Sequence, residues 1–208
     1  VRRQRQMCIR DSLHGVTSSG KTEIYVKLIE DYLKLNKQVL FLVPEIALTT
    51  QLISRLKLFF GDKLAVYHSR YSLEHRTEIW KKIINDDPKY RVVLGARSSI
   101  FLPFVKLGLV IVDEEHENAY KQFNPSPRYH ARDSAIYLSA IHSSKTLLGS
   151  ATPSLESYYN SITKKYGHVS LKKRFGNVSL PNVIIKDLKE SFNKSCLLYT
   201  SDAADELC

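Results

Sequence analysis

The stretch from Gly15 to Thr22 constrains the fold of this chain more than any other. Its two glycines and the Lys21-Thr22 pair stand at the spacing of a phosphate-binding loop. Glycines there let backbone N–H groups turn inward and form a concave nest for a pyrophosphate. A helix that begins at about Lys21 adds the positive end of its dipole. The candidate nucleotide-binding residues are Gly15, Val16, Thr17, Ser18, Ser19, Gly20, Lys21 and Thr22.

The side chains that end this loop have predicted roles. Lys21 reaches the β and γ phosphates of a nucleotide, and the Thr22 hydroxyl ligates Mg²⁺. The alternative is a Gly/Ser-rich turn that matches by chance. The flanks favour a nucleotide site, because Leu13-His14 ends a short predicted strand and apolar residues recur at helical spacing after the loop.

Predicted strands and helices alternate along the rest of the chain. The predicted helices cover residues 22–35, 46–60, 72–85, 131–142 and 153–163. The predicted strands cover residues 39–43, 64–67, 91–94, 107–112, 146–148 and 183–185. This order is typical of an α/β fold in which a parallel sheet has helices on both faces. Trp80, at helical spacing with Ile83 and Ile84, is predicted to lie in the core.

The composition narrows the class of protein. The 208-residue chain has a net charge of +10, and nucleic acid is the usual partner of such a charge. No apolar run is long enough to span a membrane, so we expect a cytoplasmic protein without a membrane partner. All three cysteines lie near the ends, at Cys8, Cys196 and Cys208, so the body has no cysteine zinc site or disulfide framework.

The two ends differ from the body in pattern. Residues 1–12 and 195–208 show no apolar periodicity, and we interpret both as non-native tails that do not enter the fold. Residues 13–168 are then expected to form one nucleotide-binding domain.

A second informative stretch begins at the buried-type strand Leu109–Val112, which is followed by Asp113-Glu114-Glu115-His116. A parallel strand that ends in acids places them at the carboxyl edge of the sheet, where α/β proteins bind ligands. Asp113 is placed to hold Mg²⁺ with Thr22, and Glu114 to orient and deprotonate a water. The alternative is an acidic loop that solubilises a strand end. Asp113, Glu114 and His116 are the candidate catalytic residues, and the two motifs together predict nucleotide hydrolysis.

Four segments resemble motifs of the superfamily 2 helicases. Asp113–His116 resembles motif II, Gly149–Ser154 motif III, Pro44–Gln51 motif Ia and Gly95–Ser99 motif Ib. The resemblance implies a RecA-like P-loop NTPase lobe with ATP and Mg²⁺ as cofactors. The residues implied to couple the γ-phosphate state to movement are Gly149, Ser150, Ala151 and Thr152. The residues implied to contact the DNA backbone are Thr49, Thr50, Arg97, Ser98 and Ser99.

The segment Asp113–Asp133 is similar to one in the PriA family of bacterial replication-restart helicases, and closest to the members from Bacteroidota. There an aromatic-rich loop links single-stranded DNA to hydrolysis. The implied DNA-binding residues are Tyr120, Phe123, Arg128 and Tyr129. Rings stack on bases while cations neutralise the backbone. The alternative is that these aromatic residues pack under a long loop.

This resemblance implies an ATP-dependent 3′→5′ DNA helicase or translocase that acts in replication restart and primosome assembly. Its expected partners are single-stranded and forked DNA, primosome proteins and single-strand-binding proteins. The second lobe with its arginine finger, the amino-terminal DNA-binding region and the zinc-binding cysteine pairs of the family have no counterpart here. We therefore expect the ATP-binding lobe of a longer protein, inactive alone and without zinc, with residues 169–194 starting the connection to a second lobe. Alternatives are another superfamily 2 nucleic-acid motor, or a nucleotide-binding switch domain without turnover.

Overall fold

A seven-stranded sheet forms the centre of the computed structural model, which describes residues 10–47 and 49–175. In spatial order the strands are β3 (Leu64–Tyr67), β4 (Val92–Gly95), β2 (Gln38–Leu42), β5 (Leu107–Val112), β8 (Lys145–Ser150), β1 (Arg10–Gly15) and β9 (Gly167–Leu171). Every neighbouring pair in this sheet is parallel. The predicted parallel sheet is therefore confirmed.

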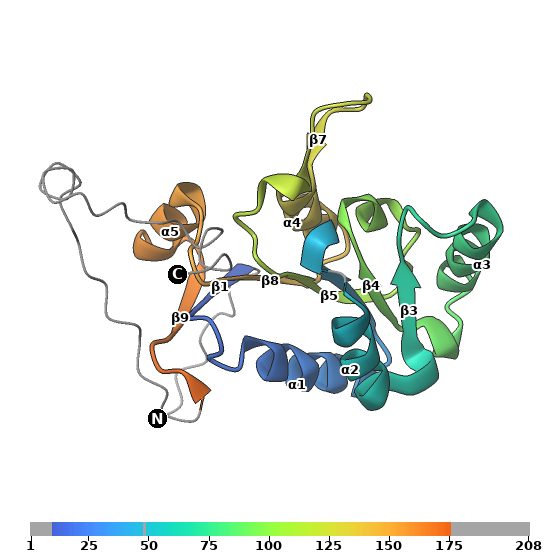
Figure 1. Ribbon diagram of the computed structural model, residues 1–208, viewed down its shortest axis with the longest axis horizontal. Helices are drawn as coiled ribbons and strands as arrows, with labels where there is room; N and C mark the ends of the chain where they lie inside the picture. Colours follow the sequence, from blue (N-terminus) through green and yellow to red (C-terminus); the bar gives the residue numbers. More distant parts are fainter. Residues whose placement is uncertain (1–9, 48, 176–208) are drawn as a thin grey trace, which may run out of the picture. The chain divides into compact units, whose positions relative to one another are not determined.

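Helices cover both faces of the sheet (Figure 1). One face packs against α1 (Lys21–Lys34) and α2 (Thr50–Phe60), and the other against α3 (Leu73–Ile84) and α4 (Ala131–Ile141). Strand β2 supplies both cores, because successive side chains of a strand point to opposite faces. Val39 and Phe41 join the core under α1 and α2, whereas Leu40 and Leu42 join the other.

Helix ends follow their capping residues. The predicted helix over residues 46–60 is two elements, a short 3₁₀ turn at Glu45–Ala47 and α2. Thr49 starts α2, since its side chain accepts a hydrogen bond from the amide of Leu52 at 3.3 Å. The fifth helix, α5 (Leu155–Ile162), is capped in the same way by Ser154.

The edge of the sheet beside the phosphate-binding loop differs from the prediction. Strand β1 begins at Arg10 and not at Leu13, so three residues that were assigned to a tail pair with β8 and β9. Strand β9 was not predicted, because three of its five residues are exposed and leave no apolar pattern. The predicted strand at 183–185, most of the connection at 169–194 and the tail at 195–208 lie outside the described residues.

Helix α3 also differs from the expectation for its core face. The side chain of Trp80 is 44% exposed, whereas Ile79 and Ile83 are buried. Ile79 and Ile83 are four residues apart and share one face of the helix, while Trp80 lies about 100° around from Ile79. The prediction that Trp80 lies in the core is wrong.

Two short antiparallel strands, β6 (Lys121–Gln122) and β7 (Tyr129–His130), form a hairpin between β5 and α4. Figure 1 shows it projecting away from the sheet beside α4. The Gln122 side-chain amide donates to the carbonyls of Pro125 at 2.9 Å and Pro127 at 3.0 Å, which closes the tip on its own backbone. The sequence predicted an aromatic loop here but no strands.

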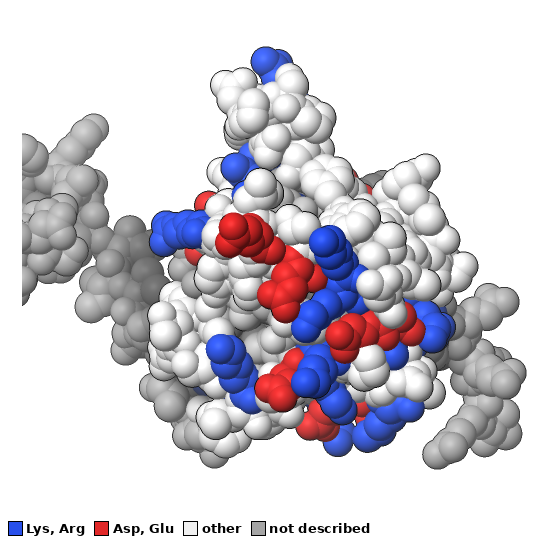
Figure 2. Space-filling model, turned by 90° about the vertical axis from the view of Figure 1, so that its right-hand side faces the viewer, with Lys and Arg blue, Asp and Glu red and all other residues white. Residues whose placement is uncertain are grey.

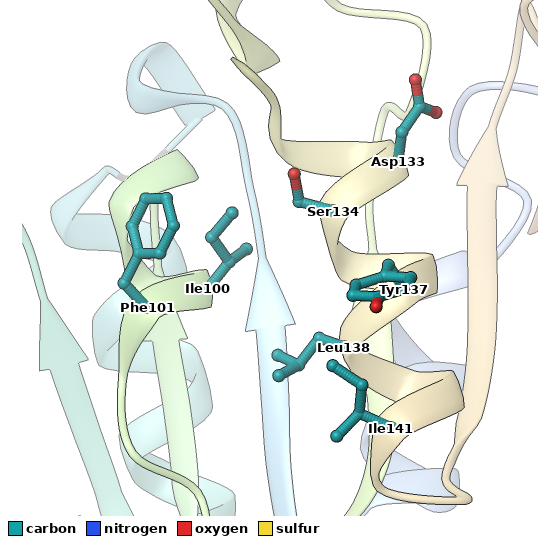
Figure 3. A pocket seen from close by; sticks show the side chains of 7 residues that line it. All are labelled: Ile100, Phe101, Asp133, Ser134, Tyr137, Leu138 and Ile141. Atoms are coloured by element: carbon teal, nitrogen blue, oxygen red, sulfur yellow. The ribbon is translucent and has the colours of Figure 1, made fainter. Parts of the chain in front are cut away.

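An apolar hollow of about 450 Å³ lies between α4 and the 3₁₀ helix η4 (Arg97–Phe101), next to the base of the hairpin (Figure 3). Its lining residues are Ile100, Phe101, Asp133, Ser134, Tyr137, Leu138 and Ile141. In Figure 3 Asp133 and Ser134 lie at the amino-terminal end of α4, and the apolar side chains follow along the helix.

The surface on the α3 side carries charges of both signs. Figure 2 shows Lys and Arg interspersed there with Asp and Glu. Within α3, for example, Lys82 pairs with Glu78 at 3.3 Å. The net charge of +10 therefore does not gather into one basic patch on this face. Over the described part of the chain, no helix has the length and apolar character needed to cross a membrane.

Candidate nucleotide-binding and coupling site

The phosphate-binding loop connects the end of β1 to the start of α1. Gly20, at the helix start, has a φ of 86°, which is a left-handed conformation that glycine adopts without strain. At Gly15 a Cβ atom would lie 2.6 Å from Ser19 Oγ, so a side chain there would displace Ser19 from its position in the loop. That hydroxyl is buried and has no hydrogen-bond partner among the described residues. A buried polar atom of this kind in such a loop fits contact with a phosphate oxygen.

Lys21 joins the loop to the acidic strand end. Its Nζ lies 3.1 Å from the carbonyl oxygen of Gly15 and 3.4 Å from Glu114 Oε1. The ammonium is mostly buried, with 11% of the side chain exposed. The structure therefore brings together the two motifs that the sequence singled out separately.

Asp113 lies directly after β5, and a hydroxyl from α1 holds its carboxylate. Tyr25 donates a 2.8 Å hydrogen bond to Asp113 Oδ1. Burial raises the pKa of Asp113 above its ordinary value, and the hydrogen bond from Tyr25 opposes that shift. Sequence analysis did not single out Tyr25, although it follows Thr22 by three residues and so lies on the same side of the helix.

Glu114 adopts a backbone conformation that is uncommon for its residue type. Its φ is 46°, in the left-handed region. Residues held in that region cluster at functional sites, where the surrounding structure fixes them. Here the turn directs the carboxylate toward Lys21 and away from the path of the strand.

The oxygen donors of the site suit Mg²⁺. Among the described residues, no three His, Cys, Asp or Glu side chains gather as a metal-binding group. Mg²⁺ needs no such group, because it is usually held by one or two protein oxygens together with substrate phosphates and water. The Asp113 carboxylate and the Thr22 hydroxyl belong to that donor class. Residues 10–175 contain no cysteine and so offer no thiolate for zinc.

His116 connects the acidic loop to the end of β8 and to the turn that follows it. Its Nδ1 lies 2.8 Å from Ser150 Oγ, and its Nε2 lies 3.2 Å from Thr152 Oγ1. Gly149 accepts a 3.1 Å hydrogen bond from the amide of Glu115. A Cβ atom at Gly149 would lie 1.7 Å from the Tyr25 hydroxyl oxygen, so only glycine fits there. The contacts of His116 are those of a link between two loops.

Glu115 is the most enclosed acid of the group, with 1% of its surface exposed. Its carboxylate accepts hydrogen bonds from the Ser154 amide at 2.7 Å, the Ser154 hydroxyl at 3.1 Å, Ser157 at 3.0 Å and Arg132 at 3.0 Å. Glu115, Arg132 and Ser157 were not predicted from the sequence as site residues. No local spacing relates these residues, because the contacts join three separate elements.

The residues expected to contact the DNA backbone lie at two strand ends. Thr49 and Thr50 are exposed at the start of α2. Arg97 is half-buried and donates to the carbonyl of Ala119 at 3.3 Å, and Ser98 beside it is half-buried. Ser99 differs from the expectation, since it is fully buried and its hydroxyl faces Gly95, where a Cβ atom would lie 1.9 Å away. Its side chain is therefore not available to DNA.

The aromatic residues of the hairpin divide into exposed and buried members. Phe123 is 60% exposed, with Lys121 Nζ 4.7 Å from its ring centre, and Arg128 is exposed nearby. Tyr129 is half-buried and packs edge-on against Phe101 with ring centres 5.0 Å apart.

Tyr120 does not occupy the surface position expected of a base-stacking residue. It is fully buried, and its hydroxyl donates a 2.6 Å hydrogen bond to the backbone carbonyl of Asp113. The reason is the 3₁₀ turn at Asn118–Tyr120, which points the ring back beneath the strand end. Tyr120 thus ties the hairpin to the acidic loop.

Comparison of the chain with known proteins identifies the family to which it belongs. The family model described as DEAD/DEAH box helicase matches residues 3–161. The chain belongs to the DEAD/DEAH box helicase family. It is also similar to proteins named replication restart protein PriA, in agreement with the resemblance found in its motifs. The relative from Bacillus subtilis is 48% identical over 178 residues, and the one from Rickettsia felis is 47% identical over 187 residues.

These matches cover most of the chain but a small part of each relative. The Bacillus subtilis alignment spans 86% of this chain and 22% of the relative, and the Rickettsia felis alignment spans 89% and 28%. Neither relative supports the narrower placement among Bacteroidota. The fold also resembles that of RecG bound to a three-way DNA junction, with a TM-score of 0.58 and 23% identity over 84% of this chain and 22% of RecG.

Proposed function

We propose that this chain is the ATP-binding lobe of a DNA helicase that translocates 3′→5′ on single-stranded DNA during replication restart. The observation that carries the proposal is the approach of Lys21 Nζ to Glu114 Oε1 at 3.4 Å. A phosphate-binding cation and a carboxylate able to accept a proton from water are the two groups that hydrolysis of a γ-phosphate requires. The similarity to proteins named PriA supports the assignment to replication restart.

Each side chain at the strand ends has a defined task in this proposal. Lys21 binds the β and γ phosphates through its ammonium. Glu114 orients the attacking water and takes its proton. Thr22 and Asp113 would hold Mg²⁺, which would neutralise charge on the phosphates when bound. Tyr25 keeps the Asp113 carboxylate in place through its 2.8 Å hydrogen bond.

The DNA-contacting part of the proposal rests on the exposed residues. Phe123 and Arg128 on the hairpin offer a ring for base stacking and a cation for phosphate. Thr49, Thr50 and Arg97 contribute hydroxyl and guanidinium donors at strand ends, which suit phosphate contact without base reading. His116 links the acidic loop to Ser150 and Thr152, so the state of the nucleotide reaches the segment that follows β8.

The proposed partners are single-stranded and forked DNA, together with primosome and single-strand-binding proteins, and the proposed location is the cytoplasm. Because the chain spans about a quarter of the length of the relatives it matches, we assign hydrolysis and unwinding to the full-length protein. Zinc is proposed for the intact family proteins and not for this lobe.

The test is ATP hydrolysis by the full-length protein with and without single-stranded DNA. We expect Lys21→Ala to lower the DNA-stimulated rate by at least about 10²-fold, because it removes a donor to the developing phosphate charge. Lys27→Ala is the matched control, since Lys27 lies on the same helix but is exposed and pairs only with Glu30 among the described residues. Partial duplexes with a 3′ or a 5′ single-stranded tail test the polarity. An undiminished rate in Lys21→Ala contradicts the assignment, and stimulation by RNA alone points to another nucleic-acid motor.

A further inference from the structure

We propose that Arg132 is a positioning residue that ties the base of the β6–β7 hairpin to the loops around the nucleotide. Through Glu115 and Ser154, it makes the position of those loops depend on the position of the hairpin. The inference rests on the proposed function, and adds to it residues for which the sequence predicted no role.

The place of Arg132 in the chain gives it a direct connection to the hairpin. Strand β7 ends at His130, and α4 begins at Ala131 without an intervening loop. Arg132 is thus the second residue of the helix that the hairpin enters. Lys121 pairs with His130 across the hairpin and directly follows the buried Tyr120. The Tyr120 hydroxyl donates a hydrogen bond to the backbone carbonyl of Asp113. Both ends of the hairpin therefore reach the acidic loop.

The contacts of Arg132 join three elements at one point. Its Nη1 lies 3.0 Å from Glu115 Oε2 and 2.8 Å from Ser154 Oγ, and its Nε donates to Asp133 at 2.9 Å. The exposed fractions of the side chains are 12% for Arg132 and 1% for Glu115. Water therefore does not screen this pair as it screens ion pairs at the surface. A guanidinium makes such a junction because its donors are fixed in a planar fork.

Glu115 passes this connection to the nucleotide site. It is flanked by Glu114, which faces Lys21, and by His116, which faces Ser150 and Thr152. Its amide bonds Gly149 at 3.1 Å, and its carboxylate bonds Ser154 and Ser157 at the start of α5. A shift of Glu115 must therefore move both the proposed water-activating carboxylate and the segment after β8.

Dense packing makes this connection suited to signalling. Buried charged groups with several hydrogen bonds do not deform gradually, because a partial displacement leaves donors or acceptors unpaired. Such networks change between discrete arrangements. When DNA moves the hairpin, Arg132 moves with α4, and the loops near the γ-phosphate follow. The alternative is a buried ion pair that only stabilises the fold.

The experiment compares ATP hydrolysis by full-length variants at a temperature at which thermal unfolding shows all of them to be folded. In Arg132→Gln we expect the DNA-stimulated kcat to fall by about 10²-fold, the size of effect that misplacement of a reacting group produces. The KM for ATP and the affinity for single-stranded DNA stay close to those of the wild type, and the DNA-free rate falls by a smaller factor than the stimulated rate. Arg132→Lys keeps the charge but not the fork, and recovers part of the stimulation.

One further variant, with two controls, keeps the inference testable if a charge change prevents folding. Ser157→Ala removes one hydrogen bond to Glu115 while leaving the ion pair intact, and lowers the stimulation to a smaller degree. Glu156→Gln, an exposed carboxylate in the first turn of α5, and Lys165→Gln, an exposed cation after that helix, are the matched controls. Both controls keep the wild-type stimulation.

Three results overturn the inference. The first is wild-type stimulation in Arg132→Gln, and the second is a fall of the basal and stimulated rates by the same factor. The third is an equal loss of DNA stimulation in Arg132→Lys and Arg132→Gln, because the positive charge that lysine retains would then restore none of the stimulation. If DNA does not stimulate ATP hydrolysis by the wild-type protein, the proposed function itself is contradicted. This outcome is measured before any variant is compared.

Discussion

The hydroxyl of Tyr25 lies 2.8 Å from Oδ1 of Asp113, and so joins the helix of the phosphate-binding loop to the end of β5. The two residues come from strands and helices that are far apart in the sequence, yet their side chains meet beside Gly149, where only glycine leaves room. Mutation of either partner therefore tests how the two nucleotide-binding motifs are held together.

The first prediction concerns Tyr25→Phe in the 208-residue chain. The change leaves a buried carboxylate oxygen without its donor, and we expect the free energy of unfolding to fall by about 1–3 kcal/mol. Urea unfolding measures the loss. Tyr32→Phe removes a half-buried hydroxyl from the same helix and serves as the control, with a smaller change expected. Equal losses in the two variants exclude a specific role for the bond to Asp113.

The second prediction separates the roles of Asp113 and Glu114 in the full-length protein. Glu114→Gln keeps the shape of the side chain but removes the base, so hydrolysis falls by about 10²–10⁴-fold while ATP and Mg²⁺ still bind. Asp113→Asn weakens Mg²⁺-dependent nucleotide affinity, because it removes the charge that faces the metal. Titration of a fluorescent ATP analogue at varied Mg²⁺ distinguishes the two. An equal loss of affinity in both variants contradicts the separate roles.

The third prediction divides the hairpin aromatic residues by burial. Phe123→Ala in the full-length protein weakens binding of single-stranded DNA by about 1–3 kcal/mol, the contribution of one stacked base. Tyr120→Phe instead lowers the melting temperature, because the buried hydroxyl loses its 2.6 Å contact with Asp113. Fluorescence anisotropy with labelled DNA and thermal unfolding are measured for both variants. If Tyr120→Phe weakens DNA binding without a loss of stability, its assignment as a packing residue is wrong.

The fourth prediction concerns the pH dependence of stability in the 208-residue chain. Burial and then the neighbouring His168 lower the pKa of His14, while Glu115 opposes the shift. The unfolded chain therefore binds more protons than the folded one below the ordinary histidine pKa of about 6.5. Stability that is present above this pH declines as the pH falls toward the lowered pKa of the folded state. His14→Gln should flatten this slope in urea unfolding below about pH 6.5.

The sequence by itself determined the fold class and the centre of the site. The glycines of the loop from Gly15 to Thr22 permit the left-handed turn at Gly20, and the strand Leu107–Val112 is apolar throughout because helices cover both of its faces. Acids placed directly after such a strand necessarily lie at the carboxyl edge of the sheet. These features depend on neighbours within a few residues, so a sequence read alone is sufficient to find them.

Tertiary structure decided which residues face the solvent and which hold the site together. Tyr120 and Phe123 are three residues apart and similar in chemistry, yet one is fully buried and the other is 60% exposed. Strand β9 joins the sheet with little apolar pattern, because β1 offers it an edge to pair with. Arg132 and Ser157 meet Glu115 only because β5 ends where α4 and α5 begin. The order of the strands in space determines such contacts, and the apolar periodicity of neighbouring residues does not reveal that order.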